Sequence, residues 1–237
     1  MAYKKPPLVE LYVEVRFKPG TLSQANIIAI IPELSQLGIG DVNIGQSPLL
    51  NQTQIGYPQF SMVPRIRCLD KTKTRIVQFS PDLAIVDLVG DYPGWDTFEG
   101  FVSQVVGLIS KIHPGAIIDS LNLVAKDAFS VAFDGFTIGR YLDCNGEVIP
   151  KLYSDIKSAS DLMLGYGFFP IDGSNSQAKI AVRINKETVA ITFETYCLKK
   201  LAETVIGTLR ILHDELNRRF EAMITQETRN NVFGGLK

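Results

Sequence analysis

Two alternating segments near the C-terminal end constrain the fold more than any other feature of the sequence. Residues 178–184 and 188–197 both alternate apolar with polar positions, and the short turn Lys186-Glu187 lies between them. One antiparallel register places three apolar pairs on the same face: Ile184 with Val189, Val182 with Ile191, and Ile180 with Phe193. Because such alternation is typical of half-buried strands, we predict a β-hairpin with one face on a core.

Other segments carry the same strand signal. Residues 9–17 have apolar side chains at every odd position, from Val9 to Phe17. Similar patterns predict strands at 60–69, 75–80, 83–89, 117–125, 128–133 and 136–142. Pro64 has no N–H to donate to a ladder, so the first of these is predicted to lie at an edge or to carry a bulge.

Two amphipathic stretches predict long helices. Apolar side chains recur at spacings of three and four over residues 96–112 and again over residues 200–228. Shorter helices are predicted at 22–31 and 152–164. The predicted fold is therefore α+β, with a curved, mostly antiparallel sheet packed on two long amphipathic helices, and the element order is compatible with a duplicated strand-strand-helix unit.

The domain prediction is one domain over residues 1–237. Its two halves, 1–115 and 116–237, each end on a long helix and are candidates for a duplication. Residues 38–59 are rich in Gly, Asn, Gln and Pro with little periodicity, so they are predicted to form a long loop or insert. Residues 230–237 are predicted to be a flexible tail.

Composition narrows the class of protein. The formal net charge is −1, so no overall field attracts nucleic acid. No apolar run approaches the ~20 residues of a membrane-spanning helix, and no secretory leader is recognisable, so a cytoplasmic protein without membrane contact is expected. The three cysteines are widely spaced and contain no Cys-x-x-Cys pair, which disfavours disulfides and zinc.

Three segments together resemble a known family. They are Lys4-Lys-Pro-Pro-Leu-Val-Glu10 running into Val15-Arg-Phe17, Arg75-Ile-Val-Gln78 continuing to Tyr92-Pro-Gly-Trp95, and the His213 to Phe220 stretch followed by a Phe-Gly-Gly ending. Their order resembles that of a sporadically distributed prokaryotic protein family to which no activity is attached. The resemblance implies a shared fold and carries over no catalytic residues.

Catalytic, metal and cofactor motifs are not recognisable. His113 precedes Pro-Gly at a predicted helix end, where a partly protonated imidazole would suit the helix dipole, and His213 lies beside Asp214 on a helix. No Gly-x-Ser-x-Gly elbow, dinucleotide fingerprint or P-loop occurs. We therefore expect no catalytic residue, no metal site and no cofactor.

A basic hairpin is the first candidate binding feature. Arg65, Arg67 and Arg75, together with Lys71 and Lys73, fall within eleven residues. Alternation places Arg65 and Arg67 on one face, so the hairpin is a candidate for binding a nucleotide, nucleic acid or an acidic partner. The alternative is a charged edge that blocks aggregation.

Two further features are candidates. Asp87 interrupts an apolar strand and either faces the interior with a raised pKa or, as we favour, faces solvent. Tyr166, Phe168 and Phe169 lie in an aromatic loop that either anchors an interface or folds back onto the sheet.

The expected function is binding without catalysis. The first hypothesis is a partner-binding accessory or antitoxin-like component of a mobile defence or stress module, with a protein partner and homodimerisation as an option. The alternative is a sensor that binds a small molecule or nucleotide between the sheet and a helix. An enzyme using carboxylates such as Asp87 ranks last.

Overall fold

The computed structural model describes residues 3–51, 59–144, 161–168, 175–184, 187–201 and 203–235. The strands are β1 (Leu8–Phe17), β2 (Ile39–Asn51), β3 (Gln59–Asp70), β4 (Arg75–Ser80), β5 (Leu83–Val89), β6 (Ile118–Ala132), β7 (Asp161–Phe168), β8 (Asn175–Ile184) and β9 (Thr188–Lys200). The helices are α1 (Gln24–Leu34), η1 (Ser35–Leu37), α2 (Trp95–Ile112), α3 (Ile138–Tyr141), α4 (Val205–Met223) and the π-helix η3 (Thr228–Val232).

The fold is α+β with a large, open, antiparallel sheet, as expected from the sequence. Its strand order is β2-β3-β4-β5-β1-β6-β9-β8-β7. The chain divides into two compact units. Unit 1 comprises residues 1–11, 123–199 and 209–237, and unit 2 comprises residues 12–122 and 200–208. None of the described helices combines the length and apolar character needed to cross a lipid bilayer.

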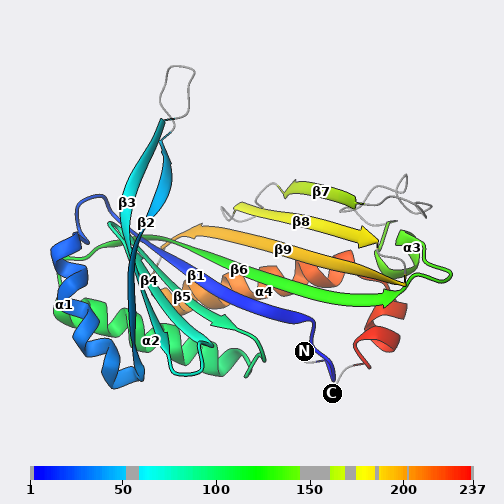
Figure 1. Ribbon diagram of the computed structural model, residues 1–237, viewed down its shortest axis with the longest axis horizontal. Helices are drawn as coiled ribbons and strands as arrows, with labels where there is room; N and C mark the ends of the chain where they lie inside the picture. Colours follow the sequence, from blue (N-terminus) through cyan, green and yellow to red (C-terminus); the bar gives the residue numbers. More distant parts are fainter. Residues whose placement is uncertain are drawn as a thin grey trace. The chain divides into compact units, whose positions relative to one another are not determined.

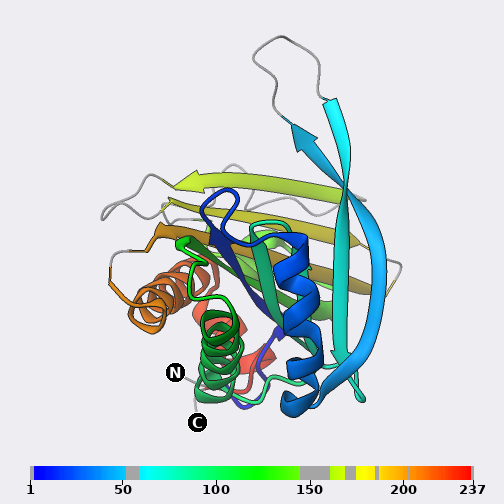
Figure 2. The ribbon, with the colours of Figure 1, turned by 90° about the vertical axis from the view of Figure 1, so that its left-hand side faces the viewer.

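In unit 2, helices α1 and α2 contribute to a core with strands β1 to β5. The buried face of α2 contains Phe98, Phe101, Val102, Val105, Val106 and Ile109, all within the amphipathic stretch predicted over residues 96–112. Strand β4 is buried from Ile76 to Phe79. Helix α1 lies beside β2 and β3 (Figures 1 and 2).

The turn between β1 and α1 is fixed by a side chain from another turn. Asp82, between β4 and β5, accepts hydrogen bonds from the backbone N–H groups of Gly20 at 2.7 Å and Leu22 at 3.0 Å. Leu22 is fully buried, and Ser23 caps α1 through a reciprocal capping box with Asn26. Helix α1 thus begins at Gln24, two residues after the start predicted from the sequence.

In unit 1, the predicted hairpin is confirmed in its register. Strands β8 and β9 pair Ile184 with Val189, Val182 with Ile191 and Ile180 with Phe193. Their apolar side joins a core that includes Phe136, Ile138, Leu142, Met223, Ile224 and Phe233. The alternation was therefore a faithful signal, because one face of this hairpin is buried.

The largest difference from the sequence prediction lies at residues 38–59. Residues 39–51 form β2, and β3 begins at Gln59, so most of this segment is strand and not loop. The side chains from Gly40 to Gln46 are all exposed. A strand exposed on both faces needs no alternation, which explains why the pattern gave no signal.

Other element boundaries also differ. The strands predicted at 117–125 and 128–133 are one strand, β6, and residues 138–141 of the predicted strand 136–142 form helix α3. Residues 161–164, predicted as helix, belong to β7. Residues 145–160 lie outside the described residues. Lys200 ends β9, and α4 begins only at Val205.

The C-terminal residues are held in place up to Gly235, in contrast to the flexible tail expected there. Phe233 is 1% exposed. The backbone N–H groups of Lys4 and Lys5 donate to the carbonyl oxygens of Gly235 and Phe233 at 3.2 and 3.0 Å. The extended N-terminal residues therefore stabilise the end of the chain within unit 1.

Replacing Asp82 tests the turn between β1 and α1. Asp82→Ala removes the acceptor of two backbone N–H groups and leaves a β-carbon at φ +57°, so we expect a loss of about 1–3 kcal/mol in the free energy of unfolding. Asp82→Asn keeps one oxygen and tolerates this φ, so it should lose less. Urea unfolding measures both, with Asp91→Ala as an exposed control; an equal loss in the control contradicts the assignment.

Candidate functional site

The basic hairpin is divided between the two faces of the sheet. Strand β3 pairs with β4 so that Ile66 faces Phe79 and Arg67 faces Gln78. Because neighbouring residues alternate between faces, Arg65 and Arg67 share one face, and Arg75 lies on the other with Phe79. Arg67 is exposed, and Arg65 is half-buried. The structure therefore does not bring the three arginines together.

Arg75 has a structural role at the β3–β4 turn. Its Nε lies 3.2 Å from Oδ2 of Asp70, and its guanidinium lies over the ring of Phe101 at 5.7 Å. Burial opposes ionisation of Asp70, but hydrogen bonds from Thr72, Arg75 and Thr74 outweigh it, so the pKa of Asp70 lies below its ordinary value. The Asp70 carboxylate thus organises the turn and neutralises the guanidinium of Arg75.

The structure places Asp87 and two of the three predicted aromatic site residues differently from the sequence prediction. Asp87 is 4% exposed and faces Ile76 in the β4–β5 register, so the favoured solvent-facing interpretation is wrong. Tyr166 and Phe168 belong to strand β7, paired with Ala178 and Ser176, and not to a loop. Phe169 lies outside the described residues.

The predicted helix-end position of His113 is confirmed. His113 is the C-cap residue of α2. Its Nδ1 lies 2.8 Å from Nδ2 of Asn26, while Oδ1 of Asn26 accepts from the N–H of Ser23 at 2.9 Å. Asn26 on α1 therefore bridges Ser23 and the ring of His113. The contact between His113 and Asn26 links α2 to α1.

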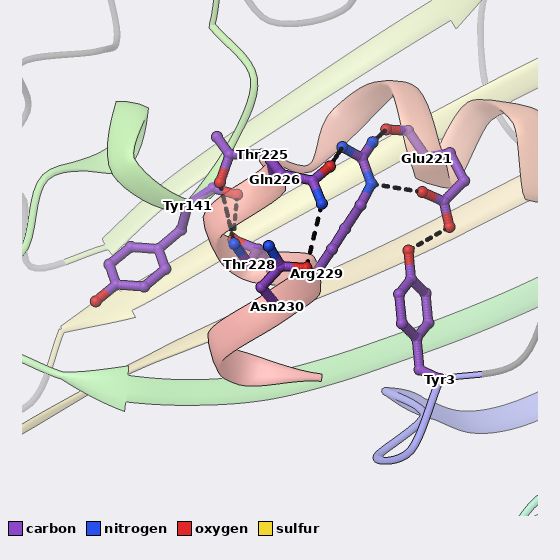
Figure 3. Close-up of polar contacts among 8 residues, drawn as sticks. All are labelled: Tyr3, Tyr141, Glu221, Thr225, Gln226, Thr228, Arg229 and Asn230. Atoms are coloured by element: carbon purple, nitrogen blue, oxygen red, sulfur yellow. Dashed lines mark hydrogen bonds and ion pairs between the residues drawn. The ribbon is translucent and has the colours of Figure 1, made fainter. Parts of the chain in front are cut away.

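A polar cluster in unit 1 joins the N-terminal segment, α4 and η3 (Figure 3). The hydroxyl of Tyr3 donates to Oε1 of Glu221 at 2.5 Å, and Nε of Arg229 donates to Oε2 of Glu221 at 2.7 Å. The ring of Tyr3 also packs on Phe233, with 5.1 Å between centroids. Glu221, on α4, thus links the N-terminal segment to η3.

The guanidinium of Arg229 donates hydrogen bonds through Nε, Nη1 and Nη2. Its Nη2 donates to the carbonyl oxygen of Glu221 at 2.5 Å, and its Nη1 donates to Oε1 of Gln226 at 3.3 Å. Nε2 of Gln226 then donates to Oδ1 of Asn230 at 3.1 Å. The first of these contacts satisfies the carbonyl group of Glu221 near the end of α4, where a cation is also favoured by the helix dipole.

Two threonines complete the cluster on the α3 side (Figure 3). The hydroxyl of Thr225 donates to the carbonyl oxygen of Arg140 at 2.7 Å, and that of Thr228 donates to the carbonyl oxygen of Tyr141 at 2.7 Å. Thr228 is fully buried. These bonds hold the segment after α4 against α3.

The chemistry of this cluster favours stability over turnover. Burial, the hydrogen bond to Glu221 and the charge of Glu221 all raise the pKa of the Tyr3 hydroxyl far above its ordinary value. Tyr3 therefore stays protonated at neutral pH and cannot act as a general base. Glu221 and Arg229 neutralise one another, so the cluster is a clasp between segments.

A buried carboxyl group that sequence reasoning missed lies on β6. Asp127 is 7% exposed, and burial raises its pKa to about 7. The polar pair Lys126-Asp127 suggested a break between two strands. In the structure Lys126 extends to Glu10 at 2.8 Å, whereas Asp127 is buried. No local pattern distinguishes those two environments.

One cavity of about 580 Å³ is described in unit 1. It is lined by residues 132–137 and Glu187. Its lining includes the carboxyl groups of Asp134 and Glu187 and no basic side chain, so it does not suit a phosphate-bearing ligand. Within the described ranges, no three His, Cys, Asp or Glu side chains gather closely enough to hold a metal ion.

Two groups of exposed apolar side chains in unit 2 are further candidate surfaces. Ile28 on α1 is 56% exposed, and Ile44 and Val42 on β2 are 76% and 39% exposed. The stretch from Gln24 to Pro32 contains no charged residue, which was the available signal for α1. For β2 no signal existed, because an exposed strand carries no alternation.

Comparisons with known proteins add no relative. The sequence matches no protein-family model, and the comparisons with curated proteins and with solved structures find no match. The resemblance to the sporadically distributed prokaryotic family therefore stays a prediction.

Removing the Tyr3 hydroxyl tests the clasp. Tyr3→Phe keeps the ring on Phe233 but deletes a hydrogen bond to a carboxylate, so we expect a loss of about 1–3 kcal/mol in the free energy of unfolding. Tyr196→Phe is the matched control, because the Tyr196 hydroxyl accepts a long, exposed hydrogen bond from Nζ of Lys179 at 3.3 Å. Equal losses of unfolding free energy for the two variants in urea would show that the Tyr3 hydroxyl makes no specific contribution to stability.

Asp127 makes stability depend on pH. Its folded pKa of about 7 exceeds the unfolded value of about 3.9, so the unfolded chain ionises first as pH rises, and stability falls between those values. Asp127→Asn does not ionise and should exceed the parent by up to roughly 4 kcal/mol above pH 7, with little difference near pH 4.

Urea unfolding across that pH range checks the prediction. Asp91→Asn, an exposed site, should show no such pH-dependent gain. A constant difference between Asp127→Asn and the parent at every pH contradicts the assignment.

Proposed function

We propose that this chain is a non-catalytic binding protein that recognises a protein partner, an accessory component of the kind expected from its sequence. The observation that carries the proposal is the outer face of α1. Four residues on this face are exposed: Ala25, Ile28, Ala29 and Pro32. A helix that is apolar all round is normally buried, so an exposed apolar face on α1 favours contact with another molecule.

The chemistry of the face favours a helix of a partner protein. Ala25 and Ala29 lie one turn apart, where small side chains let a second helix approach closely, and Ile28 offers apolar area between them. Helix α1 contains no Lys or Arg, so the face does not suit a phosphate backbone. The face also differs from a small-molecule site, since the described cavity lies on residues 132–137 and Glu187.

We also propose that the two units descend from a duplication. Leu22 is buried and precedes the N-cap Ser23 of α1, and Phe136 is buried and precedes the N-cap Thr137 of α3. In the sheet, β1 is followed by β5 and β4 on one side, as β6 is by β9 and β8 on the other. Helices α2 and α4 then follow β5 and β9, which supports two long helices in equivalent places.

A charge on α1 should abolish partner binding. Full-length chain with a photo-reactive residue in place of Ala29 is cross-linked in its source cells, and the covalent products are identified by mass spectrometry. We expect one protein product, lost when Ile28→Lys is added, because an ammonium group would be buried without a partner.

The matched control for this experiment is Ile211→Lys. Ile211 is 44% exposed on the part of α4 that belongs to unit 1, so its substitution should leave the product unchanged. A product that survives Ile28→Lys contradicts the proposal. So does an increase in melting temperature with a nucleotide or metabolite in the absence of any protein product, which would favour the sensor hypothesis.

A further inference from the structure

Strand β2 is the end strand of the described sheet. It pairs with β3 on one side, and no strand among the described residues pairs with its other side. An open edge presents a row of backbone N–H and C=O groups that a further strand can pair with. Proteins usually protect such an edge with lysine, proline or bulges. Between Asp41 and Gln46, strand β2 has none of these, and its register irregularity lies before Asp41.

Two apolar side chains at this edge, Val42 and Ile44, are exposed to solvent. Val42 and Ile44 face Cys68 and Ile66 in the β2–β3 register. Those partners are 0% and 4% exposed, whereas Val42 and Ile44 are 39% and 76% exposed. The apolar face of the sheet thus continues from β3 onto β2, but there it is uncovered. Figure 1 shows β2 and β3 as a long hairpin that extends past the end of β4.

We infer that β2 pairs with β2 of a second copy of this chain, antiparallel about a two-fold axis at Asn43. In that register Val42 lies opposite Ile44 of the second copy, and the pair repeats across the axis. Asp41, the one charged residue from Gly40 to Gln46, lies opposite a glycine, Gly45, so no like charges meet. The strand therefore complements itself in both shape and charge, which favours a second copy as the occupant.

Neighbouring registers fit less well. An axis at Ile44 pairs Val42 with Gln46 and brings Pro48, which has no N–H, opposite Gly40. An axis at Val42 pairs Ile44 with Gly40. Only the axis at Asn43 matches both apolar residues with apolar partners. Because all three axes keep each face of the sheet on its own side, the continued sheet is isologous, as in most symmetric dimers.

The interface should be weak but specific. Pairing of one short strand per chain buries less than the roughly 1,600 Å² of a standard interface, so we expect a dissociation constant in the micromolar range. The dimer uses β2, whereas the proposed partner surface is on α1. An experiment can therefore contradict the dimer proposal without contradicting the partner proposal, and the reverse also holds.

Sedimentation equilibrium of the full chain from about 1 μM to about 1 mM tests the dimer. The parent should pass from monomer to dimer across this range. Ile44→Lys places an ammonium opposite Val42 twice in each dimer, so the dissociation constant should rise at least about 100-fold. Ile117→Lys, at a residue that is 49% exposed outside β2, should dimerise as the parent does. Thermal melts check that both variants fold.

Cysteine cross-linking tests the register. The native Cys68, Cys144 and Cys197 are buried, so an introduced surface thiol reports its own contacts. Asn43→Cys should form a disulfide-linked dimer under mild oxidation, because the two copies face each other at the axis. Gln46→Cys, three residues away on the same edge, should not. A monomer at every concentration, a dimer insensitive to Ile44→Lys, or equal cross-linking at both positions overturns the proposal.

Discussion

The structure depends on the separation of side chains to the two faces of its antiparallel strands, and β1 shows this constraint most clearly. Val13 and Val15 are fully buried, whereas Glu14 between them accepts a hydrogen bond from Nδ2 of Asn122 at 3.2 Å. A shift of one residue would bury the carboxylate and expose both valines. Since burying each valine contributes about 1.5–3 kcal/mol, the register of the strand is strongly specified.

This constraint explains what the sequence could predict. Elements with one buried face show a period: β4 and β5 have their predicted bounds, and the β8–β9 register is confirmed. Strand β2 has no buried face in its middle, so composition suggested a loop. Helix α3 has four residues, too few to show a helical period, and its sequence therefore resembled a strand.

The polar sites were harder to predict, because they depend on contacts between distant residues. Tyr3 and Glu221 are separated by 218 positions, and no local spacing reports that they meet. The separation of Arg75 from Arg65 and Arg67 depends on the pairing of β3 with β4, which the turn organised by Asp70 sets. Asp87 interrupts a strand whose residues from Val86 to Leu88 are all buried, so alternation could not tell its side.

In the described part of this chain, the polar clusters are explained by folding, whereas some exposed apolar residues are not. The polar groups within the Tyr3 clasp contact one another, as do those within the Asp70 turn, and folding alone accounts for both sets of contacts. Folding does not account for Ile44, because its side chain stays in water while Ile66 opposite it is buried. Apolar side chains stabilise a structure in proportion to the area removed from water, so each proposed contact rests on the apolar area that Ile44 or Ile28 would bury. The form proposed for each contact follows from the element that carries it, since an edge strand can pair with a strand and an apolar helix face can pack on a helix.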